Sequence, residues 1–199
     1  MPLNNLTITA PALGLSAPVD MHTQLMSPMQ AFGAVVWLWG HVQEHRDLPL
    51  RALPSLLMAP IKHQQYMLAC AAASTPVAPL TSLLADGQDL QPVAYVAWAN
   101  LSAEAESRYL NNPATGLRPE DWTSGERMWV TDFFAPFGHS HAFKQIIWQC
   151  LSHSCARYLH HRGNERGMRV KTCRGAAVTP DQARAWWQAR PMQALVPTR

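Results

Sequence analysis

The stretch PVAYVAWANLSAEAESRYL, residues 92–110, decides the class of fold because it runs from a strand straight into a helix. Its first half contains Tyr95 and Trp98 among valines, and these residue types are enriched in β-strands. Ser102 then offers an N-cap for a helix that reaches Leu110, with acidic side chains in the first turn, where the positive end of the helix dipole favours them. The stretch therefore predicts a mixed α/β fold.

Upstream, Ser27 and Pro28 have the form of a helix start, with serine as N-cap and proline at the first helical position. Apolar residues follow at i, i+3, i+4 and i+7, which predicts a helix from Pro28 to about Glu44 with one buried face. QQYMLACAAA, residues 64–73, predicts a strand antiparallel to the one at 91–100. The Pro-, Ser- and Gly-rich residues between them, 74–90, predict a long surface loop.

Downstream, RMWVTDFFAPFG (127–138) and GMRVKTCRG (167–175) predict two more strands. Helices are predicted from Ser140 to about Leu159 and from Thr179 through Trp187, the last with a capping box. The order of elements predicts one α/β (α+β) domain, residues 27–199, with a mixed, mostly antiparallel central sheet flanked by helices. Residues 1–26 are polar and interrupted by prolines, so we expect a loose N-terminal arm.

Composition narrows the class of protein. Hydrophobic residues make up 48% and charged residues only 15%, which favours buried or associating surface and is far from a disordered composition. The net charge of +3 comes without a dense basic stripe, so no nucleic-acid partner is expected. The basic cluster Arg162–Arg174 is either a solvated face or a surface that attracts an acidic partner. No apolar run approaches the ~18 residues of a membrane span, and the N-terminus lacks the pattern of a signal peptide. Four cysteines without CxxC spacing suit reduced thiols, so a cytoplasmic protein is expected.

Two residues have the chemistry of a site but remain ambiguous by pattern alone. His45 follows an aromatic helix in WLWGHVQEHRDLP (37–49) and is either a helix-end partner or a general base. Asp132 interrupts the apolar strand MWVTDFFAPF and either points outward or orients an imidazole. His139 and His141 form an H-x-H without evident further ligands, so no metal site is expected.

Several ordered segments resemble the toxin-activating lysine acyltransferases, which fatty-acylate pro-haemolysins of the RTX class. The similarity runs from WLW and HRDLP through QQYMLA, PVAYVAWANLSAEAESRYL and EDWTSGERMWVTDFFAPFG to RVKTCRG, and covers about Phe32 to Gly175. Residues 92–138 are its most specific part. The resemblance selects His45 and Asp132 as the essential pair.

The resemblance also implies a GNAT-like domain, a homodimer and a cytoplasmic enzyme without a permanently bound cofactor. The expected donor is the phosphopantetheine thioester of acyl-acyl carrier protein, and the expected acceptor is an internal lysine of an RTX protoxin. His45 would act as general base, or as an acylated intermediate, and Asp132 would orient it. Four aromatic side chains either line an acyl groove or pack the core: Trp37, Trp39, Phe133 and Phe134. Arg46 is a candidate contact for the acidic carrier. These five are the candidate substrate-binding residues.

The sequence also departs from the family pattern, which often has a serine shortly before the histidine. Here GHVQE occupies those positions, with His41 and Val42, and the loop 74–90 and the N-terminal arm look extended. A divergent member leaves two alternatives open. One is the same chemistry on another acceptor peptide, such as a lysine or ornithine of a ribosomal lipopeptide precursor. The other is a catalytically inactive protein that binds the acyl carrier.

Overall fold

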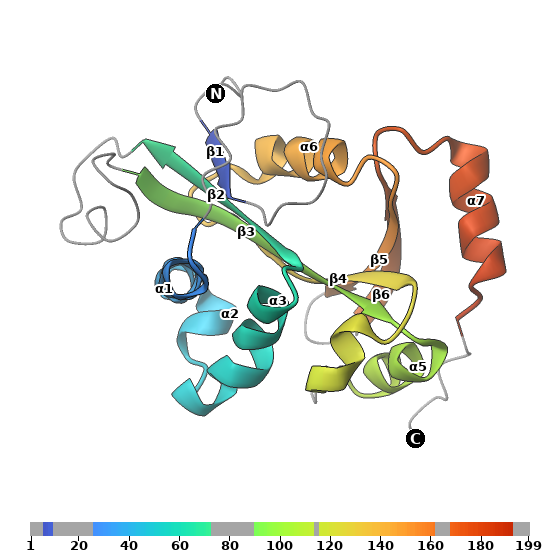
Figure 1. The fold of residues 1–199 in the computed structure, drawn as a ribbon, viewed down its shortest axis with the longest axis horizontal. Helices are drawn as coiled ribbons and strands as arrows, with labels where there is room; N and C mark the ends of the chain where they lie inside the picture. Colours follow the sequence, from blue (N-terminus) through green and yellow to red (C-terminus); the bar gives the residue numbers. More distant parts are fainter. Residues whose placement is uncertain (1–5, 10–25, 73–89, 114–115, 162–167, 193–199) are drawn as a thin grey trace. The chain divides into compact units, whose positions relative to one another are not determined.

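A computed structural model describes residues 6–9, 26–72, 90–113, 116–161 and 168–192 of the chain (Figure 1). The chain forms two compact units: the first comprises Met1–Ala97 and Asp132–Ile147, and the second comprises Trp98–Thr131 and Trp148–Arg199. The sheet has the strand order β1-β2-β3-β4-β5-β6, in which neighbours are hydrogen-bonded. Strands β3 and β4 each contribute residues to both units, so each unit is described in turn.

The first unit contains an antiparallel ladder of three strands, β1 (Leu6–Thr9), β2 (Tyr66–Ala72) and β3 (Leu90–Leu101). Tyr95 of β3 lies opposite Leu68 of β2 in this register. The two strands predicted at 64–73 and 91–100 are thus confirmed, as is their antiparallel pairing. Four residues of the predicted N-terminal arm form β1 and pair with β2.

The helix that begins at Pro28 is confirmed at its start and wrong at its end. Helix α1 (Pro28–Trp39) has the predicted serine cap, and the side chains of Ser27 and Gln30 complete a capping box. It stops at Gly40, because glycine is a poor helix former and Val42 takes an extended backbone conformation. A separate four-residue helix, α2 (Gln43–Arg46), follows.

The remaining helical turns of the first unit are short: η2 (Leu50–Ala52), η3 (Pro54–Met58) and α3 (Ala59–Lys62). Helices α1, α2 and α3 lie on the same side of β2 and β3 (Figure 1). The apolar face of α1 packs there into a buried core shared with the two strands and with the end of β4. That core includes Val35, Leu38, Trp39, Tyr66, Leu68, Tyr95 and Phe134.

The second unit is built on β4 (Arg127–Phe134), whose first five residues belong to it, with β5 (Cys155–His161) and β6 (Met168–Arg174). Strand β4 pairs with β5 in parallel, and β5 pairs with β6 antiparallel over seven positions. The helical elements α5 (Ala103–Asn111), η5 (Pro119–Thr123) and α7 (Pro180–Ala189) also belong to this unit. The mixed α/β class with a mostly antiparallel sheet is confirmed.

The helix predicted from Ser140 to about Leu159 is wrong in its second half. Helix α6 (Ser140–Cys150) ends nine residues earlier than predicted, and residues 155–161 form strand β5 instead. His160 and His161, which would stand at the end of the predicted helix, are therefore strand residues. Tertiary pairing explains the difference: β5 forms a seven-residue ladder with β6, and the N–H of Gly175 donates to the carbonyl of Ser154 just before β5 begins.

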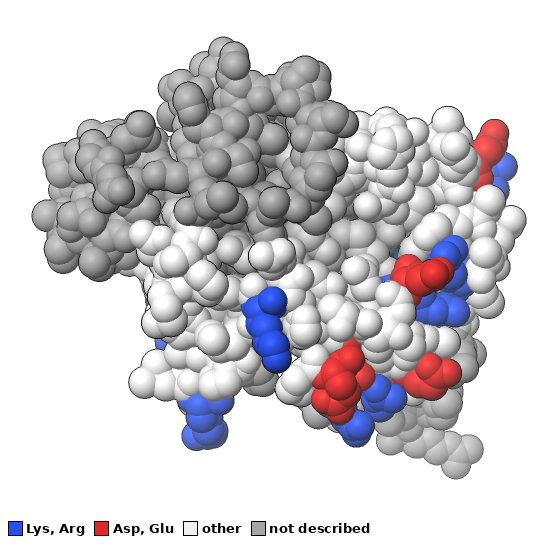
Figure 2. All heavy atoms as spheres, in the orientation of Figure 1, with Lys and Arg blue, Asp and Glu red and all other residues white. Residues whose placement is uncertain are grey.

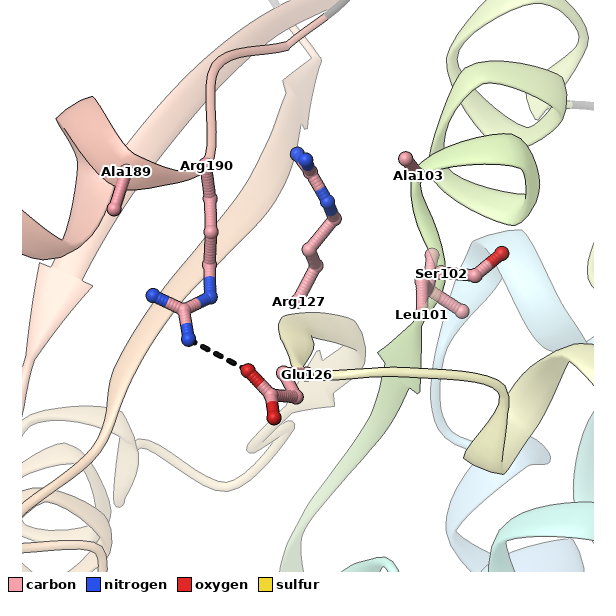
Figure 3. A pocket seen from close by; sticks show the side chains of 7 residues that line it. All are labelled: Leu101, Ser102, Ala103, Glu126, Arg127, Ala189 and Arg190. Carbon is pink, nitrogen blue, oxygen red and sulfur yellow. Dashed lines mark hydrogen bonds and ion pairs between the residues drawn. The ribbon is translucent and has the colours of Figure 1, made fainter.

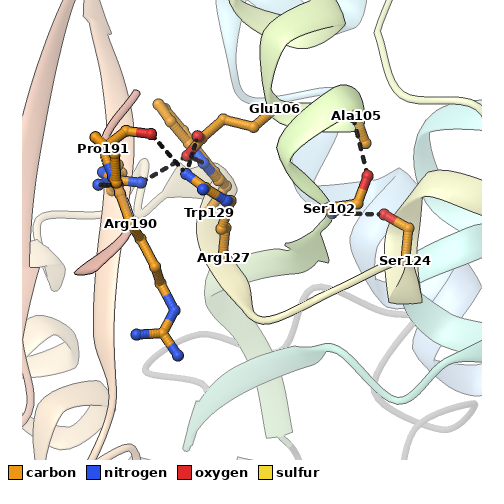
Figure 4. A network of polar contacts seen from close by, with 9 residues as sticks. Ser102, Ala105, Glu106, Ser124, Arg127, Trp129, Arg190 and Pro191 are labelled. Carbon is orange, nitrogen blue, oxygen red and sulfur yellow. Dashed lines mark hydrogen bonds and ion pairs between the residues drawn. The ribbon is translucent and has the colours of Figure 1, made fainter. Parts of the chain in front are cut away.

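A buried carboxylate ties α5 to the strands of the second unit. Glu106 is 1% exposed and accepts hydrogen bonds from Arg127 (2.6 Å), Trp129 (2.8 Å) and Arg157 (2.6 Å), as Figure 4 shows in part. Two guanidinium groups and an indole N–H thus converge on one carboxylate. Because a buried charge is tolerated only when it is paired, the three partners and Glu106 depend on one another.

The four cysteines are free thiols, three of them buried and Cys173 partly so. Burial raises the pKa of Cys70 and of Cys173 to about 12. Burial also raises the pKa of Cys150 and Cys155, although the arginines near Cys155 act in the opposite direction. The described thiols are therefore held in the protonated form at neutral pH.

Some predicted features fall wholly or partly outside the described residues. The loop predicted at 74–90 lies outside them except for Leu90, and the first half of the basic cluster Arg162–Arg174 does as well. The division of the chain at residues 26 and 27 stays a prediction. Within the described ranges, none of the helices combines the length and the apolar character needed to cross a bilayer.

We predict that Glu106→Gln lowers the free energy of unfolding by about 3–5 kcal/mol, because it leaves the buried guanidinium of Arg157 and the partly buried one of Arg127 without their counter-charge. Urea denaturation followed by circular dichroism measures this loss. Glu104→Gln is the matched control, since Glu104 lies on the same helix but faces solvent. An unchanged urea midpoint for Glu106→Gln would show that the network does not stabilise the fold.

Candidate active site

The main chain holds His45 in a short helical turn of the first unit. The N–H of His45 donates to the carbonyl of Val42 (3.0 Å), and the carbonyl of His45 accepts from the N–H of Leu48 (3.0 Å). The prediction of a single helix placed His41 and His45 on one helix face. Because helix α1 ends before Gly40 and α2 begins at Gln43, the two histidines do not share a face. The break instead brings the imidazole of His45 against Trp39, with ring centroids 5.0 Å apart.

Strand β4 supplies the carboxylate. Side chains alternate along a strand, so Asp132 and Phe134 share one face and Phe133 lies on the other. Phe134 is buried in the core of the first unit, and its ring lies 5.1 Å from that of His45. Asp132 therefore lies on the face of β4 that looks toward His45, at the edge of the core.

The two residues meet in a direct hydrogen bond. His45 Nε2 lies 3.0 Å from Asp132 Oδ2, although 87 residues of sequence separate them. The side chains are 19% and 25% exposed, so the pair is largely but not wholly enclosed. An ionised carboxylate can only accept, so the neutral imidazole carries its proton on Nε2 and keeps a lone pair on Nδ1. This arrangement fixes one tautomer, and it leaves Nδ1 as the basic atom.

The Nδ1 atom of His45 is buried and has no hydrogen-bond partner within the described part of the chain. Leaving a buried polar atom unpaired costs about 1–3 kcal/mol. A base that awaits a substrate proton has this property, because its acceptor is filled only when the substrate arrives.

The pKa of His45 is raised above its ordinary value of 6.5. Burial is the largest single influence and lowers the pKa, but the hydrogen bond to Asp132, the charge of Asp132 and the charge of Glu44 together raise it by more. The carboxylate thus makes the imidazole a stronger base than it is in water.

Three other predicted site residues lie elsewhere on the surface or in the core of the first unit. The ring of Trp37 contacts those of His41 (4.4 Å) and Phe137 (5.7 Å). Phe133 stacks on Phe143 on the other face of β4. Arg46 is 56% exposed and lies 3.8 Å from Asp47. Of the aromatic residues predicted to bind substrate, Trp39 and Phe134 are the two whose rings contact His45.

Sequence reasoning treated Tyr95 only as a strand former, but its ring packs against Phe134 at 5.3 Å, within the same core. A buried phenol and a packing aromatic give the same sequence pattern, so nothing in the sequence distinguished it. Phe137 was also unassigned, and it forms an aromatic cluster with Trp37 and His41.

The H-x-H pair was a weak metal candidate. His141 lies 3.2 Å from Gln145 on the next turn of α6. Among the residues that the structure describes, no group of three or more His, Cys, Asp or Glu side chains is placed to hold a metal ion.

A pocket of about 360 Å³ lies in the second unit, and none of the predicted site residues lines it. Its charged walls are already paired: Arg190 binds Glu126 at 2.7 Å (Figure 3), and Arg127 binds the buried Glu106. Its remaining walls come from Leu101, Ser102, Ala103 and Ala189. On the face seen in Figure 2, too, acidic side chains border basic ones, so the visible charge is mixed in sign.

A scan against protein families matches the RTX toxin acyltransferase family over residues 24–89 and 81–174. The two segments together span most of the chain and include both His45 and Asp132. The chain belongs to this family.

Named relatives agree with this assignment to the RTX toxin acyltransferases. The chain is 40% identical over 120 residues to the protein-lysine myristoyltransferase HlyC of Escherichia coli. The aligned region covers 60% of this chain and 59% of the relative. It is 35% identical over 116 residues to the protein-lysine myristoyltransferase RtxC of Kingella kingae, covering 58% and 59%. The leukotoxin-activating lysine-acyltransferase LtxC of Aggregatibacter actinomycetemcomitans is 31% identical over 139 residues, covering 69% and 72%. The chain thus spans about six-tenths of the length of HlyC and RtxC.

We predict that Asp132→Asn lowers the pKa of His45, because it removes the two largest raising influences and leaves burial in control. Titration of the histidine ring resonances by NMR measures this change. Glu44→Gln is the matched control and should lower the same pKa much less, since the charge of Glu44 raises the pKa least among these influences. An unaltered His45 titration in Asp132→Asn would contradict the pairing.

The same pairing predicts a sign for stability against pH. The folded-state pKa is raised above the unfolded value of about 6.5, so the pair stabilises the fold most below that pH. The contribution is lost as pH rises through the raised pKa. The difference in unfolding free energy between the wild type and Asp132→Asn should therefore shrink from pH 5.5 to pH 8, values chosen to lie about one unit or more to either side of 6.5.

Proposed function

We propose that this protein is a protein-lysine acyltransferase that transfers a fatty acyl chain from acyl-acyl carrier protein to internal lysines of an RTX protoxin, and thereby activates it. Membership of the RTX toxin acyltransferase family supports the reaction class. The names of HlyC and RtxC as protein-lysine myristoyltransferases support a lysine acceptor and a fatty acyl group. The single observation that carries the proposal is the His45–Asp132 hydrogen bond of 3.0 Å.

The chemistry of the pair suits this reaction. A lysine ε-amine has a pKa of about 10.4, so roughly one molecule in a few thousand is neutral and nucleophilic at pH 7. An acyl thioester is already activated, and the missing step is removal of the amine proton. His45 accepts that proton on Nδ1, while Asp132 holds the opposite nitrogen and stabilises the imidazolium that forms. A base of this kind contributes about 10²–10⁴ in rate.

An acyl-His45 intermediate is the competing mechanism, and the same nitrogen would then attack the thioester carbonyl. Both routes use Nδ1 and both need Asp132 to fix the tautomer. Either way, the aromatic rings of Trp39 and Phe134 form the apolar side of the site. Trp37 and Phe133 are the other proposed residues of an acyl groove. An acyl chain bound by them would lie farther from the imidazole, beside Phe137 and Phe143.

The acyl carrier protein is the proposed donor, and Arg46 is its proposed contact. Arg46 follows His45 directly and is exposed, so a carrier that docks there presents its thioester beside the base. Its pairing with Asp47 is long, 3.8 Å, and fully at the surface, which leaves the guanidinium available to an incoming acidic group. The described residues of the basic segment, Met168–Arg174, form strand β6 of the second unit.

Other features implied by the resemblance stay predictions: the relationship to the GNAT acyltransferases, the homodimer, the absence of a permanently bound cofactor and the cytoplasmic location. The acceptor also stays open between a protoxin and another lysine-bearing peptide, and the inactive carrier-binding protein remains the alternative of a different class. The neighbouring coding sequence separates the acceptors, because a long glycine- and aspartate-rich repeat protein favours the toxin and a short precursor peptide favours the lipopeptide.

We predict that His45→Ala and Asp132→Ala both abolish acyl transfer, reducing the rate by at least about 10²-fold, while the fold is retained. Intact-mass analysis measures the acyl gain on the acceptor after mixing with long-chain acyl-acyl carrier protein. His63→Ala is the matched control, because His63 is a partly buried histidine of the same unit outside the pair.

The outcomes distinguish the two mechanisms from each other and from the inactive carrier-binding protein. A folded His45→Ala protein with near-normal turnover would exclude His45 as the base. An acyl mass on the wild-type chain itself, lost in His45→Ala, would favour the acyl-histidine route. Binding of the carrier without transfer to any acceptor would favour the inactive carrier-binding protein.

We predict that Arg46→Glu raises the KM for acyl-acyl carrier protein by about tenfold, through a slower encounter, with kcat near the wild-type value. The effect should diminish in high salt, because exposed charges are screened beyond about 10 Å at 0.1 M. Steady-state kinetics at two salt concentrations measures both. Arg51→Glu, another exposed arginine of the same unit, is the control and should leave KM unchanged. Equal effects of the two variants would point to net charge rather than a docking contact.

A further inference from the structure

Three buried polar atoms of the first unit have no hydrogen-bond partner among the described residues and lie around the His45 site: Trp39 Nε1, His45 Nδ1 and Tyr95 OH. Trp39 is 5% exposed and Tyr95 is 1% exposed, so bulk water does not serve their polar atoms. Folded proteins rarely leave buried donors unpaired. An unpaired buried donor next to a candidate site therefore calls for an explanation.

A chain of ring contacts connects the three side chains, with Phe134 lying between His45 and Tyr95. The ring of Trp39 lies 5.0 Å from that of His45. Phe134 bridges the other two, with its ring 5.1 Å from His45 and 5.3 Å from Tyr95. The pKa of Tyr95 is raised mainly by burial, and the charge of Asp132 raises it further. The phenol is therefore fully protonated and is a hydrogen-bond donor at neutral pH.

The unpaired atoms complement the reacting centre of an aminolysis. An indole N–H can only donate, and a protonated phenol donates its single hydrogen, whereas Nδ1 of His45 accepts. A tetrahedral intermediate presents the opposite set, with an oxyanion that accepts and an ammonium that gives up a proton. Enzymes stabilise such an oxyanion with preorganised donors in a site that excludes water.

We propose that Tyr95 and Trp39 form the oxyanion-binding donors of this enzyme, with the hydroxyl of Tyr95 and the indole N–H of Trp39 directed at the carbonyl oxygen of the acyl thioester. The inference rests on the proposed acyl transfer and adds two residues to its site. Both would be catalytic residues, since they contact the reacting carbonyl.

The lysine reacts as the neutral amine. Its nitrogen lone pair forms a bond to the thioester carbonyl carbon, and the π electrons of the carbonyl move to its oxygen, which becomes the oxyanion held by Tyr95 and Trp39. Nδ1 of His45 takes the proton that the nitrogen releases. When the oxyanion collapses, the C–S bond breaks and the thiolate of the carrier leaves, and the imidazolium returns the proton to that sulfur. The amide and the free thiol are the products.

Tyr95→Phe is the sharpest test, because it removes the unpaired hydroxyl and keeps the ring. The variant should lose about 10²–10³-fold in kcat, the cost of removing one donor of this kind, with little change in the KM for acyl-acyl carrier protein. Its thermal midpoint should stay the same or rise, since the change deletes a buried donor that the folded protein leaves unsatisfied. Activity and stability should thus move in opposite directions.

Tyr66→Phe is the matched control. Tyr66 is 5% exposed, its ring stacks on that of Tyr95 at 6.3 Å, and its hydroxyl is not among the unpaired buried atoms. It removes a phenol oxygen from the same core without touching the proposed donor set, so kcat should stay within about twofold of wild type. Trp39→Phe tests the second donor and should also lower kcat, with the thermal midpoint measured alongside.

The outcomes distinguish this inference from the function on which it rests. Wild-type transfer with a normal kcat in Tyr95→Phe overturns the oxyanion role and leaves the acyltransferase intact. Equal losses in Tyr95→Phe and Tyr66→Phe, or a loss that follows a lowered thermal midpoint, also overturn it, because they indicate a packing role. Absence of transfer by the wild type overturns the proposed function, and the oxyanion role with it.

Discussion

The site depends on one hydrogen bond between residues that only the tertiary fold can bring together, His45 on α2 and Asp132 on β4. Neither element would hold its side chain in place alone. Helix α2 has four residues, which is too short to be stable in isolation, and the end of β4 is fixed by the alternation that buries Phe134. The pair is therefore a product of the core of the first unit, and the basicity of His45 follows from its contact with Asp132.

The same balance of forces explains why the imidazole is both buried and basic. Burial alone would make His45 a weaker base, and the carboxylate reverses that tendency. A carboxylate farther away, or a fully exposed one, would leave solvent to screen the interaction. A partly enclosed pair keeps the attraction strong, and both side chains still retain some exposed surface.

Local sequence patterns predicted the starts of elements well and their ends less well. The caps at Ser27, Ser102 and Thr179 could be predicted from the sequence, because each serine or threonine side chain accepts from an N–H group three residues away. The strand Cys155–His161 was not legible, since its pairing with β6 is a contact between segments distant along the chain. The end of α1 before Gly40 was missed for a different reason: the prediction followed the apolar spacing and gave no weight to the glycine, which is a poor helix former.

The candidate site divides in the same way. The sequence singled out His45 and Asp132 through a family resemblance, but their spacing in the chain carries no hint of their contact. Tyr95 was invisible as anything but a strand former, because its neighbours in PVAYVAWA are equally apolar. What distinguishes it is that its hydroxyl has no partner among the residues that the structure describes, and that property exists only once the core has formed.

The burial of the thiols bears on the thioester donor that we propose for this protein. Thioesters exchange readily with thiolates, so an accessible, ionised cysteine would intercept the acyl chain and strand it on the wrong atom. Burial keeps Cys70 and Cys173 at a pKa of about 12 and raises that of Cys150 and Cys155 as well. With the proposed thioester donor, this burial would prevent self-acylation on sulfur and would leave the activated carbon to a nitrogen nucleophile.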